Sequence, residues 1–77
     1  MSKLPLLTGK ELGKIISKIG YEYSHSSGSH MTYINKYKSH KVTIPNHGSE
    51  KLRPGLLIKI IKKDLYLSRK EFLELLK

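Results

Sequence analysis

The side chains best suited to chemistry in this sequence are its four histidines, His25, His30, His40 and His47. Imidazole is the side chain that exchanges protons near neutral pH. A positioned imidazole can accept the proton of an RNA 2′-hydroxyl, so that the 2′-oxygen attacks the adjacent phosphorus while basic side chains stabilise the charge on the phosphoryl oxygens. RNA cleavage is thus one reaction open to such residues, and that route requires no metal ion.

Two of the histidines have neighbours that favour such a role. His30 follows a Gly-Ser pair at the start of a predicted strand, and His47 lies between Asn46 and Gly48 in a polar loop. A histidine on a strand is more often an ordinary polar surface residue. Position along the chain therefore leaves both interpretations of His30 open.

Other catalytic chemistries lack their residues in this chain. It contains no cysteine, and its only aspartate is Asp64, which lies in a lysine-rich segment. The sequence has no paired-carboxylate motif, no phosphate-binding loop and no dinucleotide fingerprint, and the histidine spacings do not match a metal site. We therefore expect neither a cofactor nor a metal.

The net charge points to the kind of partner. The chain has 77 residues, with 15 Lys and Arg against 6 Asp and Glu, a net charge of +9. This length predicts a single domain over residues 1–77, and the charge indicates a polyanionic partner, nucleic acid first. The alternative is a lysine-rich surface that serves only solubility. Basic residues beside tyrosines and around the second predicted helix suit contact with an RNA backbone. These candidate RNA-binding residues are Lys36, Lys38, Lys41, Lys51, Arg53 and Lys59.

The composition also bears on location. No apolar run approaches the roughly 20 residues that a membrane helix needs. The absence of cysteine suits a reducing compartment. We expect a cytoplasmic protein that has no membrane partner.

Spacing and capping signals predict three helices and three strands. Thr8 with Glu11, and Ser68 with Glu71, form capping-box patterns, each followed by apolar residues at helical spacing. Short links between the strand-like segments favour an antiparallel meander. The expected class is α+β, a three-stranded antiparallel sheet with helices on one face. The predicted helices cover residues 9–19, 54–64 and 69–76, and the predicted strands cover 21–25, 30–35 and 40–45.

Alternation along the middle strand assigns its two faces. Met31 and Tyr33 share one face, and His30, Thr32 and Ile34 share the other. If Met31 and Tyr33 face the helices, His30 lies on the open face of the sheet, although the apolar Ile34 argues the other way. The expected core is Leu12, Ile15, Ile16, Ile19, Val42, Ile44, Leu57, Ile60 and Ile61.

Five segments resemble motifs of the HicA (YcfA-like) toxin family of type II toxin–antitoxin systems. Residues 8–12 (TGKEL) are similar to the family's helix opening, and residues 28–30 (GSH) to its G-S-H turn. Residues 42–47 (VTIPNH), 52–57 (LRPGLL) and 67–72 (LSRKEF) resemble its V-x-V-P-x-H, L-x-x-G-T-L and L-S-x-E-E-F patterns. The order and spacing of the pieces make the combination specific.

The resemblance implies a double-stranded-RNA-binding-like αβββα fold with a short extra C-terminal helix. It also implies an endoribonuclease that cleaves mRNA and stops translation. The family's catalytic histidine follows Gly-Ser, so that role carries over to His30 as general base, with Gly28 and Ser29 as candidate catalytic or substrate-contact residues. His47 matches a second common histidine and is a candidate acid, substrate contact or structural residue. The implied partners are mRNA and HicB, the antitoxin that covers the active site.

Two other functions fit the same sequence. A domain of this fold could bind RNA through its lysines without cleaving it, which salt-sensitive binding without cleavage would show. The basic face could instead bind an acidic protein. Co-purification with a protein, together with no measurable affinity for RNA, would favour that second alternative.

Overall fold

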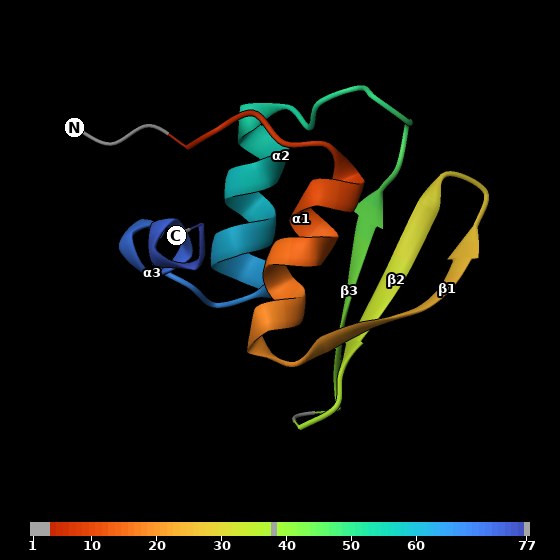
Figure 1. Ribbon diagram of the computed structural model, residues 1–77, viewed down its shortest axis with the longest axis horizontal. Helices are drawn as coiled ribbons and strands as arrows, with labels where there is room; N and C mark the ends of the chain where they lie inside the picture. Colours follow the sequence, from red (N-terminus) through yellow and green to blue (C-terminus); the bar gives the residue numbers. More distant parts are fainter. Residues whose placement is uncertain (1–3, 38, 77) are drawn as a thin grey trace.

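The computed structural model describes residues 4–37 and 39–76 of the chain. The elements follow one another as α1, η1, β1, β2, β3, α2, η2 and α3. Figure 1 shows the helices on one side of a three-stranded sheet, with α3 farthest from it. This arrangement confirms the expected α+β class. No helix in the described part of the chain is long and apolar enough to cross a membrane.

The first helix begins where its capping box predicts. In α1 (Gly9–Ile16), the Thr8 amide donates to Glu11 Oε1 at 2.8 Å, and the Glu11 amide donates to Thr8 Oγ1 at 3.1 Å. The helix then tightens into a 3₁₀ turn, η1 (Ser17–Ile19), and stops at Gly20, whose φ of 99° is left-handed. The single helix expected here is therefore an α-helix followed by a tighter last turn.

The sheet is an antiparallel meander in the order β1–β2–β3. Its strands are β1 (Tyr21–Ser27), β2 (His30–Asn35) and β3 (His40–Pro45). The first strand is two residues longer than the sequence predicts, and the turn after it is correspondingly shorter. Only Gly28 and Ser29 connect β1 to β2, and Gly28 has a φ of 60°. A glycine at the first central position suits such a two-residue hairpin turn.

A β-bulge interrupts the pairing of β1 with β2. Tyr23 pairs with Tyr33, but the next pair is His25 with Thr32, so Ser24 is an extra residue on β1. A bulge of this kind changes the face on which the following side chains lie. The simple aromatic–polar alternation of residues 21–25 therefore does not continue through His25.

The faces of β2 follow the expected alternation. Met31 and Tyr33 are buried against the helices, whereas His30 and Ile34 are exposed. The prediction that His30 lies on the open face is confirmed. Ile34 keeps 40% of its surface exposed, because no helix or strand of residues 4–37 and 39–76 covers that face of the sheet.

The second helix changes its winding halfway. α2 (Pro54–Lys59) continues into a π-helical segment, η2 (Ile60–Asp64), in which the Leu65 amide donates to the carbonyl of Ile60 at 2.9 Å. The segment predicted as a helix over 54–64 is helical throughout, and its second half winds as a π-helix. The wider turn accompanies burial of both Ile60 and Ile61, at 1% exposure each. A second capping box, Ser68 with Glu71, then starts α3 (Arg69–Leu75).

The core includes most of the residues expected from helical and strand spacing, with two exceptions. Ile15 and Ile19 are only partly buried, because α1 turns its glycines toward the sheet. A Cβ added to Gly13 would lie 2.0 Å from the Tyr33 hydroxyl, so the Tyr33 ring packs against the helix where a larger residue would displace it. The buried apolar residues outside the expected core set are Leu7, Tyr21, Met31, Tyr33, Leu52, Leu65 and Phe72.

The end of β2 farther from His30 is fixed by a buried amide. Asn35 is 3% exposed; its Nδ2 donates to the Ile19 carbonyl at 3.2 Å, and its Oδ1 accepts from the Tyr37 amide at 2.8 Å. The first hydrogen bond joins the sheet to the end of η1, and the second fixes the turn that follows β2. This satisfied buried group helps to hold the sheet at one orientation to the helices.

Candidate active site

His30 is the first residue of β2 and follows the tight Gly28–Ser29 turn directly. It pairs with Ser27 of β1 on one side and with Pro45 of β3 on the other. Its side chain is exposed on the face that the helices leave open. The hairpin end thus presents an imidazole to solvent.

The end of β3 brings His47 to the same end of the sheet. The Asn46 amide donates to the Ser29 carbonyl at 2.6 Å, which holds the chain beside the hairpin turn as it leaves β3. Asn46 Oδ1 then accepts from the Gly48 amide at 3.3 Å and closes a turn around His47, which is exposed. The two histidines of the sequence motifs therefore lie near one end of the sheet, on adjacent segments.

A cavity of about 250 Å³ opens beside His47. Pro45, the β3 partner of His30, is one of its walls, so the cavity borders the same end of the sheet. It combines cationic, acidic and apolar groups, which suits a polar ligand such as a nucleotide. Its lining residues are Pro45, His47, Glu50, Lys51, Leu52, Arg53 and Leu56.

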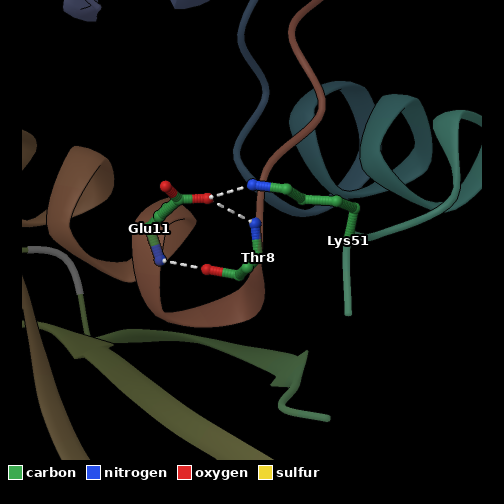
Figure 2. A network of polar contacts seen from close by, with 3 residues as sticks. All are labelled: Thr8, Glu11 and Lys51. Atoms are coloured by element: carbon green, nitrogen blue, oxygen red, sulfur yellow. Dashed lines mark hydrogen bonds and ion pairs between the residues drawn. The ribbon is translucent and has the colours of Figure 1, made fainter. Parts of the chain in front are cut away.

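The loop that carries Lys51 is anchored on the start of α1. Figure 2 shows Glu11 Oε1 receiving the Thr8 amide and the Lys51 ammonium, the latter at 3.3 Å. The hydrogen bond from the Thr8 amide, and next the one from Lys51, hold the pKa of Glu11 below its ordinary value. Backbone contacts add to this link, because the Leu52 amide donates to the Leu7 carbonyl at 2.7 Å. Lys51 therefore shares its charge with a carboxylate, and both Lys51 and Arg53 are exposed.

The remaining cations expected to bind RNA do not gather around His30. Lys36 follows the opposite end of β2, where its Nζ lies 3.3 Å from Glu22 Oε1 and 5.5 Å from the centre of the Tyr37 ring. The Glu22 carboxylate, and then Tyr37, raise the pKa of Lys36. Lys41 pairs with Ile34, also toward that end. Lys59 lies in α2, away from the open face of the sheet, and Lys38 lies outside the described residues.

The other two histidines differ sharply in their surroundings. His40 is partly buried between the rings of Tyr21 and Tyr66, at centroid distances of 6.3 and 6.0 Å, and its Nε2 lies 2.5 Å from the Asp64 carbonyl oxygen. It joins β3 to the end of η2, a structural position. His25 is exposed, and the bulge pairs it with Thr32, on the face of His30. Sequence alternation gave no sign of that placement. Within residues 4–37 and 39–76, no three His, Asp or Glu side chains gather in a way that could hold a metal ion.

The fold and this site define a class: a small, strongly basic α+β domain that presents histidines at one open end of its sheet. Residues 9–64 match the family model described as the HicA toxin of bacterial toxin–antitoxin systems. The chain therefore belongs to the HicA toxin family, and its fold is consistent with the double-stranded-RNA-binding-like fold of that family. No curated protein and no solved structure gives a significant match.

Proposed function

We propose that this chain is the toxin of a HicAB-type toxin–antitoxin pair and a metal-independent endoribonuclease that cleaves mRNA and so inhibits translation. The observation that carries the proposal is the exposed His30 at the hairpin end of β2, in a chain that belongs to the HicA toxin family. The nearby cavity with His47 and Arg53 supports it, because it supplies polar groups where a bound nucleotide would extend.

In the proposed reaction, neutral His30 accepts the proton of a 2′-hydroxyl. The 2′-oxygen forms a bond to the adjacent phosphorus and the bond from phosphorus to the 5′-oxygen breaks, which leaves a 2′,3′-cyclic phosphate and a 5′-hydroxyl. A positioned general base of this kind contributes roughly 10²–10⁴-fold to a rate. Arg53 is the cation best suited to the phosphoryl oxygens, because its guanidinium offers several donors and Lys51 is shared with Glu11.

The hairpin turn suits a close approach by the RNA backbone. Gly28 is exposed, and a Cβ built on it would meet no atom within 4 Å, so the turn presents an open surface beside His30. Ser29 has its carbonyl engaged by Asn46, which leaves its hydroxyl as the group for substrate. The lysines toward the other end of the sheet, Lys36 and Lys41, would contact phosphates farther along the strand.

The proposed protein partner is a HicB-like antitoxin that covers the open face and the His30 end. An acidic surface on that partner would complement the net charge of +9. Co-expression with the reading frame adjacent to the gene tests this, with a stable complex that no longer cleaves RNA as the expected result. Failure of the two proteins to associate would contradict the partner assignment.

The test of the nuclease is RNA cleavage by purified protein in the presence of EDTA. Wild type should cleave, and His30→Gln, purified identically, should lose at least about 100-fold of the rate. The variant also controls for contamination, because a contaminating nuclease would be present equally in both preparations. Equal cleavage by both proteins would refute the role of His30. Salt-sensitive binding without any cleavage by wild type would instead identify a non-catalytic RNA-binding module.

A further inference from the structure

The bulge in β1 has a specific consequence for His25. Without the extra residue Ser24, the register set by Tyr23 and Tyr33 would pair His25 with Met31, which is 5% exposed and faces the helices. With the bulge, His25 pairs with Thr32 and lies on the open face instead. Bulges are common next to active sites because they redirect a side chain in this way.

The redirected imidazole is a diagonal neighbour of His30. His25 is opposite Thr32, and His30 is two residues before Thr32 on the same strand and face. Diagonal neighbours across an antiparallel pair are roughly 7–8 Å apart. Side chains on strand positions that far apart can each reach one phosphodiester that lies between them, through a hydrogen bond of about 2.6–3.2 Å. Both side chains are exposed, so a nucleic acid can reach the space between them.

A local contact orients the His25 ring. Ser24 Oγ lies 3.1 Å from His25 Nδ1, so the bulged residue itself holds one ring nitrogen. In the imidazolium form, Nδ1–H donates to the serine hydroxyl, and Nε2–H is the proton to be transferred. The nearest charged side chains on this face are Glu22 and Lys41. They are the cross-strand partners of Ile34, two residues after Thr32 on β2, and Glu22 also forms an ion pair with Lys36.

We propose that His25 is the general acid of the reaction in which His30 is the general base, an inference that rests on the proposed nuclease function. His30 takes the proton of the 2′-hydroxyl as the 2′-oxygen bonds to phosphorus. As the bond from phosphorus to the 5′-oxygen breaks, protonated His25 gives its Nε2 proton to that oxygen. His30 ends charged and His25 neutral, so one proton is gained and one is lost, and no metal or other reactant is needed.

This assignment predicts a bell-shaped dependence of the cleavage rate on pH. The rate rises as His30 loses its proton and falls as His25 loses its own. His25→Gln should lower the rate by about 10²–10⁴-fold and remove the alkaline fall, while the acidic rise remains. Ser26→Ala is the control. Ser26 lies on the same exposed strand but pairs with Met31, on the face opposite His30, so this variant should keep the wild-type cleavage rate and both limbs of the pH profile.

The decisive experiment changes the leaving atom of the substrate. The site that wild type cleaves is first mapped in an RNA oligonucleotide, which is then made with sulfur in place of the 5′-oxygen at that site. A thiolate leaves without a proton, so it needs no general acid. His25→Gln should therefore be slow on the oxygen substrate and within a few-fold of wild type on the sulfur substrate, whereas His30→Gln should be slow on both.

Two results would overturn the role of His25. A His25→Gln variant that is equally slow on both substrates would show a binding or structural role, and one as fast as wild type on the oxygen substrate would show no role. In either case cleavage by wild type and its loss in His30→Gln would leave the nuclease proposal intact. Absence of cleavage by wild type on both substrates would refute the two proposals together.

Discussion

Replacing Gly9 with alanine should destabilise the domain, because α1 and the end of β3 pack together too closely for a methyl group. A Cβ on Gly9 would lie 2.1 Å from the Pro45 carbonyl oxygen. Ordinary contact begins at 3.4 Å, so helix or strand must move by about 1.3 Å, the difference between the two distances. The obstacle is backbone, which cannot rotate aside as a side chain would.

The magnitude follows from two opposing effects. Overpacking in a tight core costs about 1–3 kcal/mol, and the higher helix propensity of alanine returns at most about 1 kcal/mol. We therefore expect Gly9→Ala to lower the free energy of unfolding by about 1–2 kcal/mol. For a small domain the free energy of unfolding falls by about 1 kcal/mol per molar urea, so the urea concentration at the unfolding midpoint should fall by about 1–2 M. Because Pro45 pairs with His30, RNA cleavage should fall as well.

Gly55→Ala is the matched control for this substitution. Gly55 lies in α2, and a Cβ built on it meets no atom within 4 Å. The same chemical change should therefore stabilise the domain there, by about 0.4–1 kcal/mol. If urea unfolding showed Gly9→Ala to be as stable as Gly55→Ala, the close packing of α1 on β3 would be refuted.

Three further predictions, made with five substitutions, test other parts of the structure. Leu57→Ala empties a site that is 1% exposed and should cost about 2–5 kcal/mol; a thermal unfolding midpoint within a degree or two of wild type would contradict this. The pKa values of Glu11 and Glu71 are lowered by the backbone amides that they cap. Their contribution to stability is therefore present above the ordinary value of 4.5 and lost as pH falls through the lowered one. Urea midpoints of Glu11→Gln and Glu71→Gln should lie below wild type at pH 7 and converge with it in acid; a gap that does not change with pH would count against the capping account. Arg53→Gln should weaken RNA binding and reduce the slope of log affinity against log salt by about 1, whereas Lys51→Gln should reduce it less because Glu11 already shares that charge. Equal slopes for the two variants in fluorescence anisotropy would argue against this difference.

The sequence was enough to predict the order of elements because their signals are local. The capping boxes at Thr8 and Ser68 and the tight turn at Gly28 act within a few residues of themselves. Alternation along β2 likewise depends only on the period of an extended chain, so it placed His30 on the face opposite Met31 and Tyr33; the helices then decide which face is open.

The features that sequence spacing missed depend on contacts between distant segments. The face that α1 buries is set by Gly13 against Tyr33, twenty residues apart in sequence, and so Ile15 and Ile19 move to the edge. The Lys51–Glu11 pair joins residues 40 apart. The bulge at Ser24 and the π-helical turn at Ile60 also depart from the regular strand and helix periods. Predictions from residue spacing assume those periods throughout.

The arrangement of the candidate site could be predicted only in part from the sequence, for the same reason. The motif spacing singled out His30 and His47, and the sheet register brings their segments to one end. The placement of His25 was not accessible, because a one-residue change of register reverses the face of a strand residue. Charge alone also did not show which cations are shared with carboxylates, as Lys36 and Lys51 are.

The central claim, that His30 activates a 2′-hydroxyl of RNA, is tested most directly by removing that hydroxyl. Two oligonucleotides are compared with wild-type protein in EDTA, one all-RNA and one with a single 2′-deoxy nucleotide at the mapped cleavage site. We expect the RNA to be cut to a 2′,3′-cyclic phosphate and a 5′-hydroxyl, and the deoxy site not to be cut. Cleavage at the deoxy site, or products that carry a 5′-phosphate, would contradict it.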